Sequence, residues 1–351
     1  MEIQLNKEQE NAVKTNKSKV LVAAGAGAGK TRVITERLKY LLTLGENPKN
    51  IYAITYTNMA ANEMRERVNN PDIFIGTIHS LANRILMING IDTSNIIEDE
   101  EFDKLFSLIK KENIELPQID HLLIDEFQDI CDNEYEFTMD ILKPKNFFVC
   151  GDSAQSIYSF KGSNYKYFMN LVNNPFVYTY ELKNNYRCGL NIINFGEDFL
   201  GSQKDIYKIK AKCMSGIDGD VSVESFNLNK ILELLEKKDF KDWFILCRTN
   251  NEIEQICYFL TKNHIPNITF KKSEMTEVDM KKELSSNKVK VLTIHSAKGL
   301  ESKNVIVIGA RKWGAEELRI CYVAATRAKE NLIWMTNSPK KKTNYKMREW
   351  G

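Results

Sequence analysis

The chain has 351 residues, of which 43% are hydrophobic, 27% charged and 10% aromatic, a composition typical of a globular protein with room for two domains. Its formal net charge of +2 gives no bulk attraction to nucleic acid, so any basic binding surface has to be local. The seven cysteines form no C-x-x-C pair, which argues against a disulfide framework and a zinc site and favours the cytoplasm. We find neither a signal-peptide core nor an apolar run of about 20 residues, which argues against secretion and membrane insertion.

In chain order, the first half alternates short apolar, β-branched runs with longer helical patterns. Alternation of this kind predicts βαβ units around a buried parallel sheet. The predicted strands are residues 20–23, 51–55, 73–77, 122–125, 147–150 and 177–182.

A second series of strands follows Arg187 and predicts a second, similar sheet. Its strands are predicted at 221–225, 243–247, 289–294, 305–308 and 332–335. The turn-forming cluster at 173–175 predicts the boundary between domains 1–175 and 176–351. Segments 267–279 and 339–351 carry little structural signal, and the lysines at 340–342 are more typical of a solvated charge run than of a phosphate contact.

The strongest local motif is AGAGAGKT, placed between the first predicted strand and an amphipathic helical pattern. It comprises Ala24, Gly25, Ala26, Gly27, Ala28, Gly29, Lys30 and Thr31. Its glycines let backbone N–H groups surround a β-phosphate, Lys30 can reach the β- and γ-oxygens, and the Thr31 hydroxyl can bind Mg²⁺. Ala24 replaces the first glycine of the strict P-loop pattern, so the match depends on Gly29, Lys30 and Thr31. A chance GKT in a glycine-rich turn is the alternative, and the strand–loop–helix order disfavours it.

A pair of carboxylates, Asp125 and Glu126, follows the apolar run 122–124. A buried parallel strand delivers such residues to the sheet edge where ligands gather. We expect Asp125 to hold Mg²⁺ through water and Glu126 to polarise the water that attacks the γ-phosphate. Without an upstream P-loop, the same pair would be interpreted as a helix cap or a solvated acid.

ATP hydrolysis also needs positive charge at the phosphoryl oxygens, and the first half offers only Lys30 and Arg32 near the loop. Arg187, in NNYR, and Arg327, in VAATRAK, are candidate arginine fingers from the second half. The alternative, that both simply face solvent, is not excluded by spacing.

Eight blocks in one order resemble motifs of the UvrD/Rep/PcrA group of superfamily 1 helicases. They are LNKEQENAV (the Q motif), ITYTNMAANEMRERV (Ia), GTIHS (Ib), LLIDEFQD (II), VCGDSAQSIYSFKG (III), ELKNNYR (IV), VLTIHSAKGLE (V) and ICYVAATRAK (VI). The resemblance spans the chain and implies two tandem RecA-like P-loop NTPase domains, with the ATP site in the cleft between them.

The resemblance also implies roles for single residues. Gln9 would read adenine, Gln155 would sense the γ-phosphate, Tyr186 would stack on the base, and Gly299 and Glu301 would belong to the ATP site, with Glu301 at the ribose. The implied nucleic-acid track comprises Tyr56, Thr57, Asn58, Thr77, His79, Tyr158, Phe160, His295 and Ser296. Aromatic residues suit such a track because stacking on bases tolerates any sequence. A core position is the alternative for Phe160, where the family usually has tryptophan.

The chain departs from the family pattern at several positions, none of which removes an indispensable charge. These are Ala28, Lys161, Asn184 and Ser302, where the family commonly has Ser, Arg, Gln and an aromatic residue. The segments 81–121 and 267–288 are short where the family carries accessory domains 1B and 2B. We therefore expect a short helical insertion in the first domain and a short linker in the second.

His79 and His295 each lie in a TIHS string without neighbouring cysteines or a carboxylate cluster, so a metal site there is disfavoured. Phosphate contacts from Ser, Thr and backbone N–H groups explain these strings better.

The resemblance implies an ATP- and Mg²⁺-dependent translocase or helicase that moves 3′ to 5′ on single-stranded DNA, with cleft closure coupled to hydrolysis. A junction of single and double strands is compatible with this role. The alternative is an ATP-gated nucleic-acid-binding subunit that needs a protein partner to unwind. A small-molecule kinase is disfavoured by the second set of motifs. The motifs do not decide between DNA and RNA, and they do not indicate the oligomeric state or the pathway, which could be repair, phage replication or defence.

Overall fold

The computed structural model describes residues 4–112, 114–236, 239–270, 277–310, 314–336 and 343–344. The chain divides into two compact units, Met1–Lys183 and Asn184–Gly351. Within the described residues, no helix is long and apolar enough to cross a membrane. The lysines at 340–342 lie outside the described residues, as do residues 271–276 of the weakly patterned segment.

The first unit is built on a six-stranded parallel sheet with the order β3-β2-β4-β5-β1-β6. Its strands are β1 (Lys19–Ala24), β2 (Ile51–Ile54), β3 (Phe74–Gly76), β4 (His121–Ile124), β5 (Asn146–Gly151) and β6 (Tyr178–Leu182). All six predicted strands of the first series are confirmed.

The first unit extends beyond the predicted boundary at residue 175. Strand β6 pairs in parallel with β1, in the register Val20 to Tyr178, and so belongs to the first sheet. The polar turn 173–175 only joins a helix to this edge strand, and the structure places the division after Lys183.

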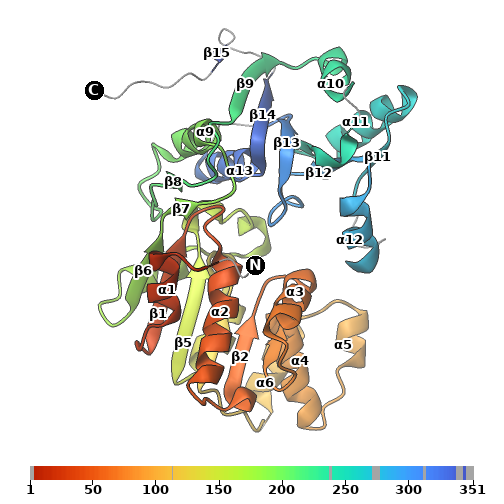
Figure 1. The fold of residues 1–351 in the computed structure, drawn as a ribbon. Helices are drawn as coiled ribbons and strands as arrows, with labels where there is room; N and C mark the ends of the chain where they lie inside the picture. The colour runs from red at the N-terminus through yellow and green to blue at the C-terminus, as the bar shows by residue number, and fades with distance from the viewer. Residues whose placement is uncertain are drawn as a thin grey trace. The chain divides into compact units, whose positions relative to one another are not determined.

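Helices flank the first sheet (Figure 1). The helices are α1 (Lys7–Val13), α2 (Lys30–Thr43), α3 (Asn58–Val68), α4 (Ile78–Ile88), α5 (Ser94–Glu98), α6 (Asp103–Lys111), α7 (Asp132–Tyr135) and α8 (Lys166–Val172), with a π-helix at Glu136–Ile141. Buried residues of α1, α2 and α3 share one core cluster with the strands of the sheet. Val20 and Val22 of β1 pack with Ile34 and Leu38 of α2 in one core. This apolar layer fixes α2, and with it the loop that precedes α2, against the carboxyl end of β1.

The second unit contains six parallel strands, with one short antiparallel strand added at an edge. In spatial order they are β11 (Asn267–Ile268), β12 (Val289–Thr293), β10 (Trp243–Cys247), β13 (Ser302–Val307), β14 (Ala328–Thr336), β9 (Asp220–Ser225) and the antiparallel β15 (Thr343–Asn344). All five predicted strands are confirmed, and so is the α/β class with tandem RecA-like sheets. The sequence did not predict the short strands β11 and β15, or the two-stranded pair β7 (Asn184–Asn185) and β8 (Lys212–Cys213).

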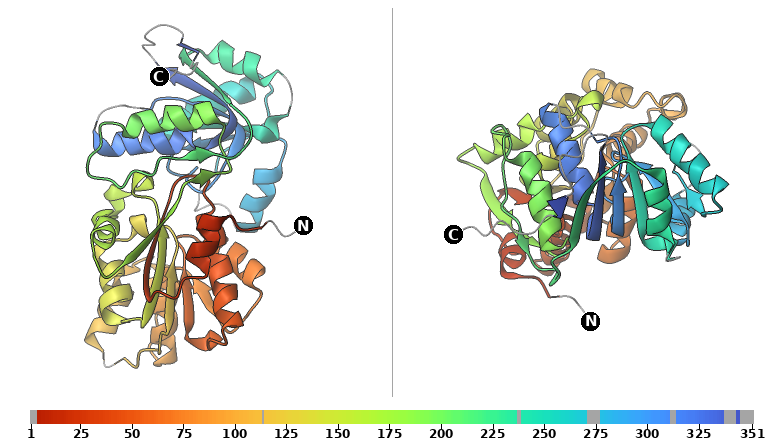
Figure 2. Two further views of the ribbon diagram at one scale, coloured as in Figure 1. Left: turned by 60° about the vertical axis from the view of Figure 1, so that its left-hand side comes forward. Right: turned by 90° about the horizontal axis from the view of Figure 1, so that it is seen from above.

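Helices cover both faces of the second sheet (Figure 2, right). They are α9 (Leu190–Leu200), α10 (Leu228–Leu235), α11 (Asn250–Lys262), α12 (Glu277–Ser285) and α13 (Ala315–Ala325). Apolar residues of α10 and α11, such as Ile231 and Ile256, share a core with β10 and β12. Helices α9 and α13 pack together, and Gly196 of α9 allows the close approach to Tyr322.

Candidate ATP and nucleic-acid site

The glycine-rich loop joins β1 to α2, as the sequence predicts. Gly27 and Gly29 have φ angles of +68° and +84°, in the left-handed region that favours glycine, and Gly29 is the N-cap of α2. Lys30 is buried and its Nζ donates to the Ala24 carbonyl oxygen at 3.4 Å, while Arg32 follows in the first turn of α2. The backbone therefore has the geometry of an anion-binding helix N-terminus.

Thr31 and Asp125 come together although 94 residues separate them. The Thr31 hydroxyl donates to Asp125 Oδ2 at 2.7 Å. Burial, and then the neighbouring Glu126 carboxylate, raises the pKa of Asp125 to about 6, against the lowering effect of the Thr31 hydroxyl and Lys30. The predicted meeting of the loop and the carboxylate pair at one sheet edge is thus observed.

Glu126 lies in the left-handed region with φ +53°, at the turn from β4 into the short 3₁₀ helix Phe127–Asp129. Such a conformation is uncommon for a residue other than glycine and is found often at functional sites. Gln128 Nε2 donates to Glu126 Oε2 at 2.6 Å. The Glu126 carboxylate is therefore held by the Gln128 amide. We did not single out Gln128 from the sequence, although it lies in the LLIDEFQD string.

Gln155, the predicted γ-phosphate sensor, bonds to Asp152, the residue that follows β5. Its Nε2 donates to Asp152 Oδ2 at 2.7 Å. Both residues are buried, and burial raises the pKa of Asp152, although Lys30 and Gln155 act to lower it. Asp152 is a second residue that sequence reasoning missed, and its place in the VCGDSAQSIYSFKG string was the available signal.

Gln9, the predicted adenine reader, contacts the loop itself. Its Nε2 donates to the Ala28 carbonyl oxygen at 3.1 Å, and its Oε1 accepts from the Asn6 backbone N–H at 3.1 Å. A Cβ atom at Gly29 would lie 3.0 Å from the same amide nitrogen. Gln9 therefore braces the P-loop from α1 in this structure.

The donors present suit Mg²⁺. Thr31 and Asp125 offer hydroxyl and carboxylate oxygens, which are ligands that a hard cation prefers. Among the described residues, no group of three or more His, Cys, Asp or Glu is arranged to hold a metal ion. These two oxygens fit an ion that takes its other ligands from water and nucleotide phosphates, as Mg²⁺ commonly does.

In the second unit, Arg187 contacts Glu301. Arg187 Nε donates to Glu301 Oε2, and Lys329 Nζ lies 2.6 Å from Glu301 Oε1. Burial alone would raise the pKa of Glu301, but Arg187 and Lys329 together outweigh it and leave that pKa below its ordinary value. One carboxylate is thus shared by two cations, and Lys329 is a third residue that the sequence analysis missed.

Arg327 is held by backbone oxygens of its own unit. Its Nε donates to the Val323 carbonyl at 2.9 Å and its Nη1 to the Leu300 carbonyl at 3.2 Å. Arg187 Nη1 in turn donates to the Thr326 carbonyl at 3.4 Å. The structure therefore gathers the two predicted arginine fingers and Glu301 around the turn that contains Gly299 and around the end of α13. Tyr186, the predicted base-stacking residue, is 45% exposed.

The predicted strand track of the first unit is an aromatic cluster. The Tyr56 and Tyr158 rings stack at 5.4 Å, and Phe160 meets Tyr158 edge-on at 6.1 Å. Phe160 is 67% exposed, so the core alternative for this residue is wrong. Tyr158 is buried, which leaves Phe160 as the most accessible ring for stacking on a base.

The polar members of this track lie at helix starts. The Thr57 hydroxyl caps α3, which begins at Asn58, and the Thr77 hydroxyl caps α4. His79 packs on the rings of Phe102 and Phe106, and burial lowers its pKa against the opposing effect of Glu134 and Asp103. Both helix N-termini can attract a phosphate.

His295 and Ser296 lie in the turn after β12 of the second unit. Thr293 Oγ1 accepts from the Ser296 backbone N–H at 3.0 Å, and the two hydroxyls are 2.9 Å apart. These residues form a small hydroxyl-lined turn of the kind that binds phosphate oxygens.

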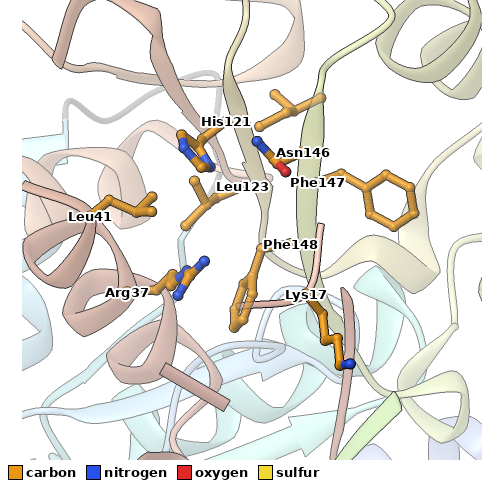
Figure 3. A pocket seen from close by; sticks show the side chains of 9 residues that line it. Lys17, Arg37, Leu41, His121, Leu123, Asn146, Phe147 and Phe148 are labelled. Atoms are coloured by element: carbon orange, nitrogen blue, oxygen red, sulfur yellow. The ribbon is translucent and has the colours of Figure 1, made fainter. Parts of the chain in front are cut away.

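A small pocket lies at the opposite, amino-terminal edge of the first sheet (Figure 3). It is lined by His121 and Asn146, which start β4 and β5, and by Arg37 of α2. Arg37 donates to the Val13 and Thr15 carbonyls at 2.7 and 2.8 Å. This pocket is therefore separate from the P-loop edge and plays no part in the candidate site.

Comparison with protein families gives two matches. Residues 5–117 and 113–175 match the UvrD/REP helicase N-terminal domain, and residues 269–339 match the UvrD-like helicase C-terminal domain.

Curated relatives agree with these matches. The chain is 26% identical to a probable DNA helicase of Mycoplasma pneumoniae, covering 95% of this chain and 83% of that protein. It is 27% identical to the ATP-dependent DNA helicase PcrA of Leuconostoc citreum (75% of this chain, 49% of that protein) and 26% identical to PcrA of Staphylococcus aureus (75% and 50%). The chain thus spans about half the length of its PcrA relatives.

The matched domains, the P-loop bonded to the Asp125 carboxylate and the ordered motifs lead to one assignment: this chain belongs to the UvrD/REP helicase family.

Proposed function

We propose that this chain is an ATP-driven motor that moves 3′ to 5′ along single-stranded DNA. ATP binding and hydrolysis would alternate its grip on the strand. The observation that carries the proposal is the Thr31–Asp125 bond, because it unites the phosphate-binding loop and the carboxylate pair at one edge of the first sheet.

In this proposal each group has a defined task. Lys30 holds the β- and γ-phosphate oxygens, and Thr31 and Asp125 hold Mg²⁺, which supplies positive charge to the phosphates when bound. Glu126 accepts a proton from the attacking water. Arg187 and Arg327 stabilise the negative charge that develops on the γ-phosphate.

The strand would be bound mainly by stacking and by phosphate contacts. Phe160 offers an exposed ring backed by Tyr158 and Tyr56. The capped starts of α3 and α4 offer N–H groups to phosphates. Binding of this kind is weakly sequence-specific and strongly salt-dependent.

A second candidate function is an ATP-gated strand-binding subunit that unwinds only with a partner protein. It is favoured by two internal segments, 81–121 and 267–288, which are short where the family carries its accessory domains 1B and 2B. The two functions share the ATP site and differ in whether the chain separates strands unaided.

The test is ATP turnover with and without a saturating single-stranded oligonucleotide, made of DNA or of RNA. We expect turnover to rise with the DNA strand, and no stimulation by either strand would contradict the motor. Duplexes with a 3′ or a 5′ single-stranded tail then separate the two functions. The motor should open only the 3′-tailed duplex, whereas a dependent subunit should open neither.

A further inference from the structure

Gln128 is a fully buried polar residue that bonds to both predicted binding regions of the first unit. On one side, its Nε2 donates to Glu126 Oε2 at 2.6 Å. On the other side, its Oε1 accepts from the Asp152 backbone N–H at 2.9 Å. Because its side chain has no solvent exposure, Gln128 acts through these neighbours and not by touching a DNA strand.

The main chain of Gln128 holds the same second region. Its carbonyl oxygen accepts from Ser156 Oγ at 3.2 Å and from Ser163 Oγ at 3.3 Å. Together with Asp152, these contacts attach segment 152–163 to Gln128 at three points. This is the segment that carries the Tyr158 and Phe160 rings.

The amide has little room to move independently. A Cβ atom at Gly151 would lie 2.7 Å from Gln128 Oε1 and 3.0 Å from the Phe168 ring. Since interiors packed this closely have few voids, a displacement of one neighbour is passed to the next. A shift of the ring-bearing segment must therefore move the Gln128 amide or break its bonds.

We propose that Gln128 is the positioning residue that couples a strand stacked on Phe160 to the Glu126 carboxylate. This inference depends on the proposed function. Without a strand, the Gln128 amide occupies one Glu126 oxygen with a hydrogen bond. When a base stacks on Phe160, segment 152–163 shifts, the amide follows, and Glu126 is reoriented toward the attacking water. The link shares Asp152 with Gln155, because the Asp152 backbone N–H bonds to Gln128 and its carboxylate accepts from Gln155.

The test is the ratio of strand-stimulated to strand-free ATP turnover in Gln128→Met and Ser163→Ala. Methionine fills a similar volume without the donor and the acceptor, and Ser163→Ala removes one attachment to the Gln128 main chain while it leaves the Gln128 amide in place. Ser107→Ala is the matched control, because this exposed hydroxyl bonds to the Asp103 carbonyl of its own helix. We expect the ratio to fall about tenfold in Gln128→Met, within the usual range of coupling between two sites, and less in Ser163→Ala. Affinity for a fluorescent single-stranded oligonucleotide should change little.

The outcomes are distinguishable. If the wild-type protein is not stimulated by a strand, the proposed function fails. If the wild-type protein is stimulated and both variants keep its ratio, the function stands and the role of Gln128 is overturned. Loss of strand affinity in parallel with loss of stimulation would also overturn it, because Gln128 would then merely shape the strand-binding surface. Should Gln128→Met fail to fold, as judged by thermal unfolding, Ser163→Ala alone decides.

Discussion

The two units hold their charged groups in different ways. In the first unit, the proposed catalytic carboxylates bond to neutral side chains, Asp125 to Thr31 and Glu126 to Gln128. In the second unit, the cations are already paired, Arg187 with Glu301 and Arg327 with backbone carbonyls. If Arg187 and Arg327 act on a phosphate as proposed, they must first exchange these partners, whereas the carboxylates of the first unit have no cationic partner to exchange among the bonds named here. This comparison predicts that substitutions in the first unit remove chemistry and that substitutions around Glu301 alter the placement of a cation.

A large effect is expected from Glu126→Gln in the first unit. Loss of the proton acceptor should lower ATP turnover about 10²- to 10⁴-fold, the usual contribution of a general base. Steady-state turnover at saturating ATP checks this, with Glu63→Gln, a half-exposed carboxylate on α3, as the control. Near-normal turnover of Glu126→Gln would show that another group takes the proton.

A smaller effect is expected from Glu301→Gln in the second unit. The neutral side chain no longer pairs with Arg187 and Lys329, so the predicted finger loses its alignment. We expect kcat to fall by up to about 10²-fold, as for a misplaced catalytic group, with little change in KM for ATP. Glu317→Gln, which breaks the ion pair to Arg248, is the matched control.

The opposite pattern for Glu301→Gln, a raised KM with kcat preserved, would support the ribose role that the family resemblance implies. The ratio of kcat/KM for ATP to that for 3′-deoxy-ATP distinguishes the positioning role of Glu301 from a ribose-binding role. A positioning role leaves the discrimination between the two nucleotides unchanged, whereas a ribose role abolishes it.

Phe160→Ala should weaken strand binding by about 1 to 3 kcal/mol, the usual contribution of one base stacked on an aromatic ring. Phe176→Ala is the control, because this phenylalanine is 81% exposed in the same unit but lies outside the predicted track. Fluorescence anisotropy with a labelled oligonucleotide measures both. Equal losses in the two variants would remove Phe160 from the strand site.

The smallest effect concerns pH. The pKa of Asp125 is raised to about 6, so this carboxyl group is protonated below that pH and must lose its proton to bind Mg²⁺. Apparent Mg²⁺ affinity in the presence of ATP should therefore fall more steeply below pH 6 in the wild-type protein than in Asp125→Asn, because the ATP phosphates take up protons in both measurements. Equal steepness in the two proteins would show that Asp125 does not hold the ion.

The sequence predicted the sheets and the P-loop because these depend on contiguous signals, namely apolar runs of strand length and a glycine pattern between strand and helix. It did not predict the partners of Glu126 and Glu301. Gln128 meets the Asp152 N–H across 24 residues, and such a meeting depends on the order of strands in the sheet. The exposure of Phe160 was also undecided, because an aromatic residue in a loop suits a core as well as a surface.

The edge strand β6 shows a further limit. Its residues were predicted as a strand, but the preceding polar turn resembled a domain boundary, and only the pairing of β6 with β1 assigns it to the first unit. Local turn chemistry does not reveal which sheet receives the next strand.

In the proposed motor, arginines of the second unit complete the chemistry of the first. ATP turnover of Arg187→Ala and Arg327→Ala, measured at saturating strand beside Arg248→Ala and with nucleotide affinity followed in parallel, tests it most directly. We predict that turnover falls about 10³-fold or more in both variants, as for loss of an arginine finger, while the nucleotide still binds and Arg248→Ala retains its activity. Turnover that survives both substitutions in folded protein would contradict the claim.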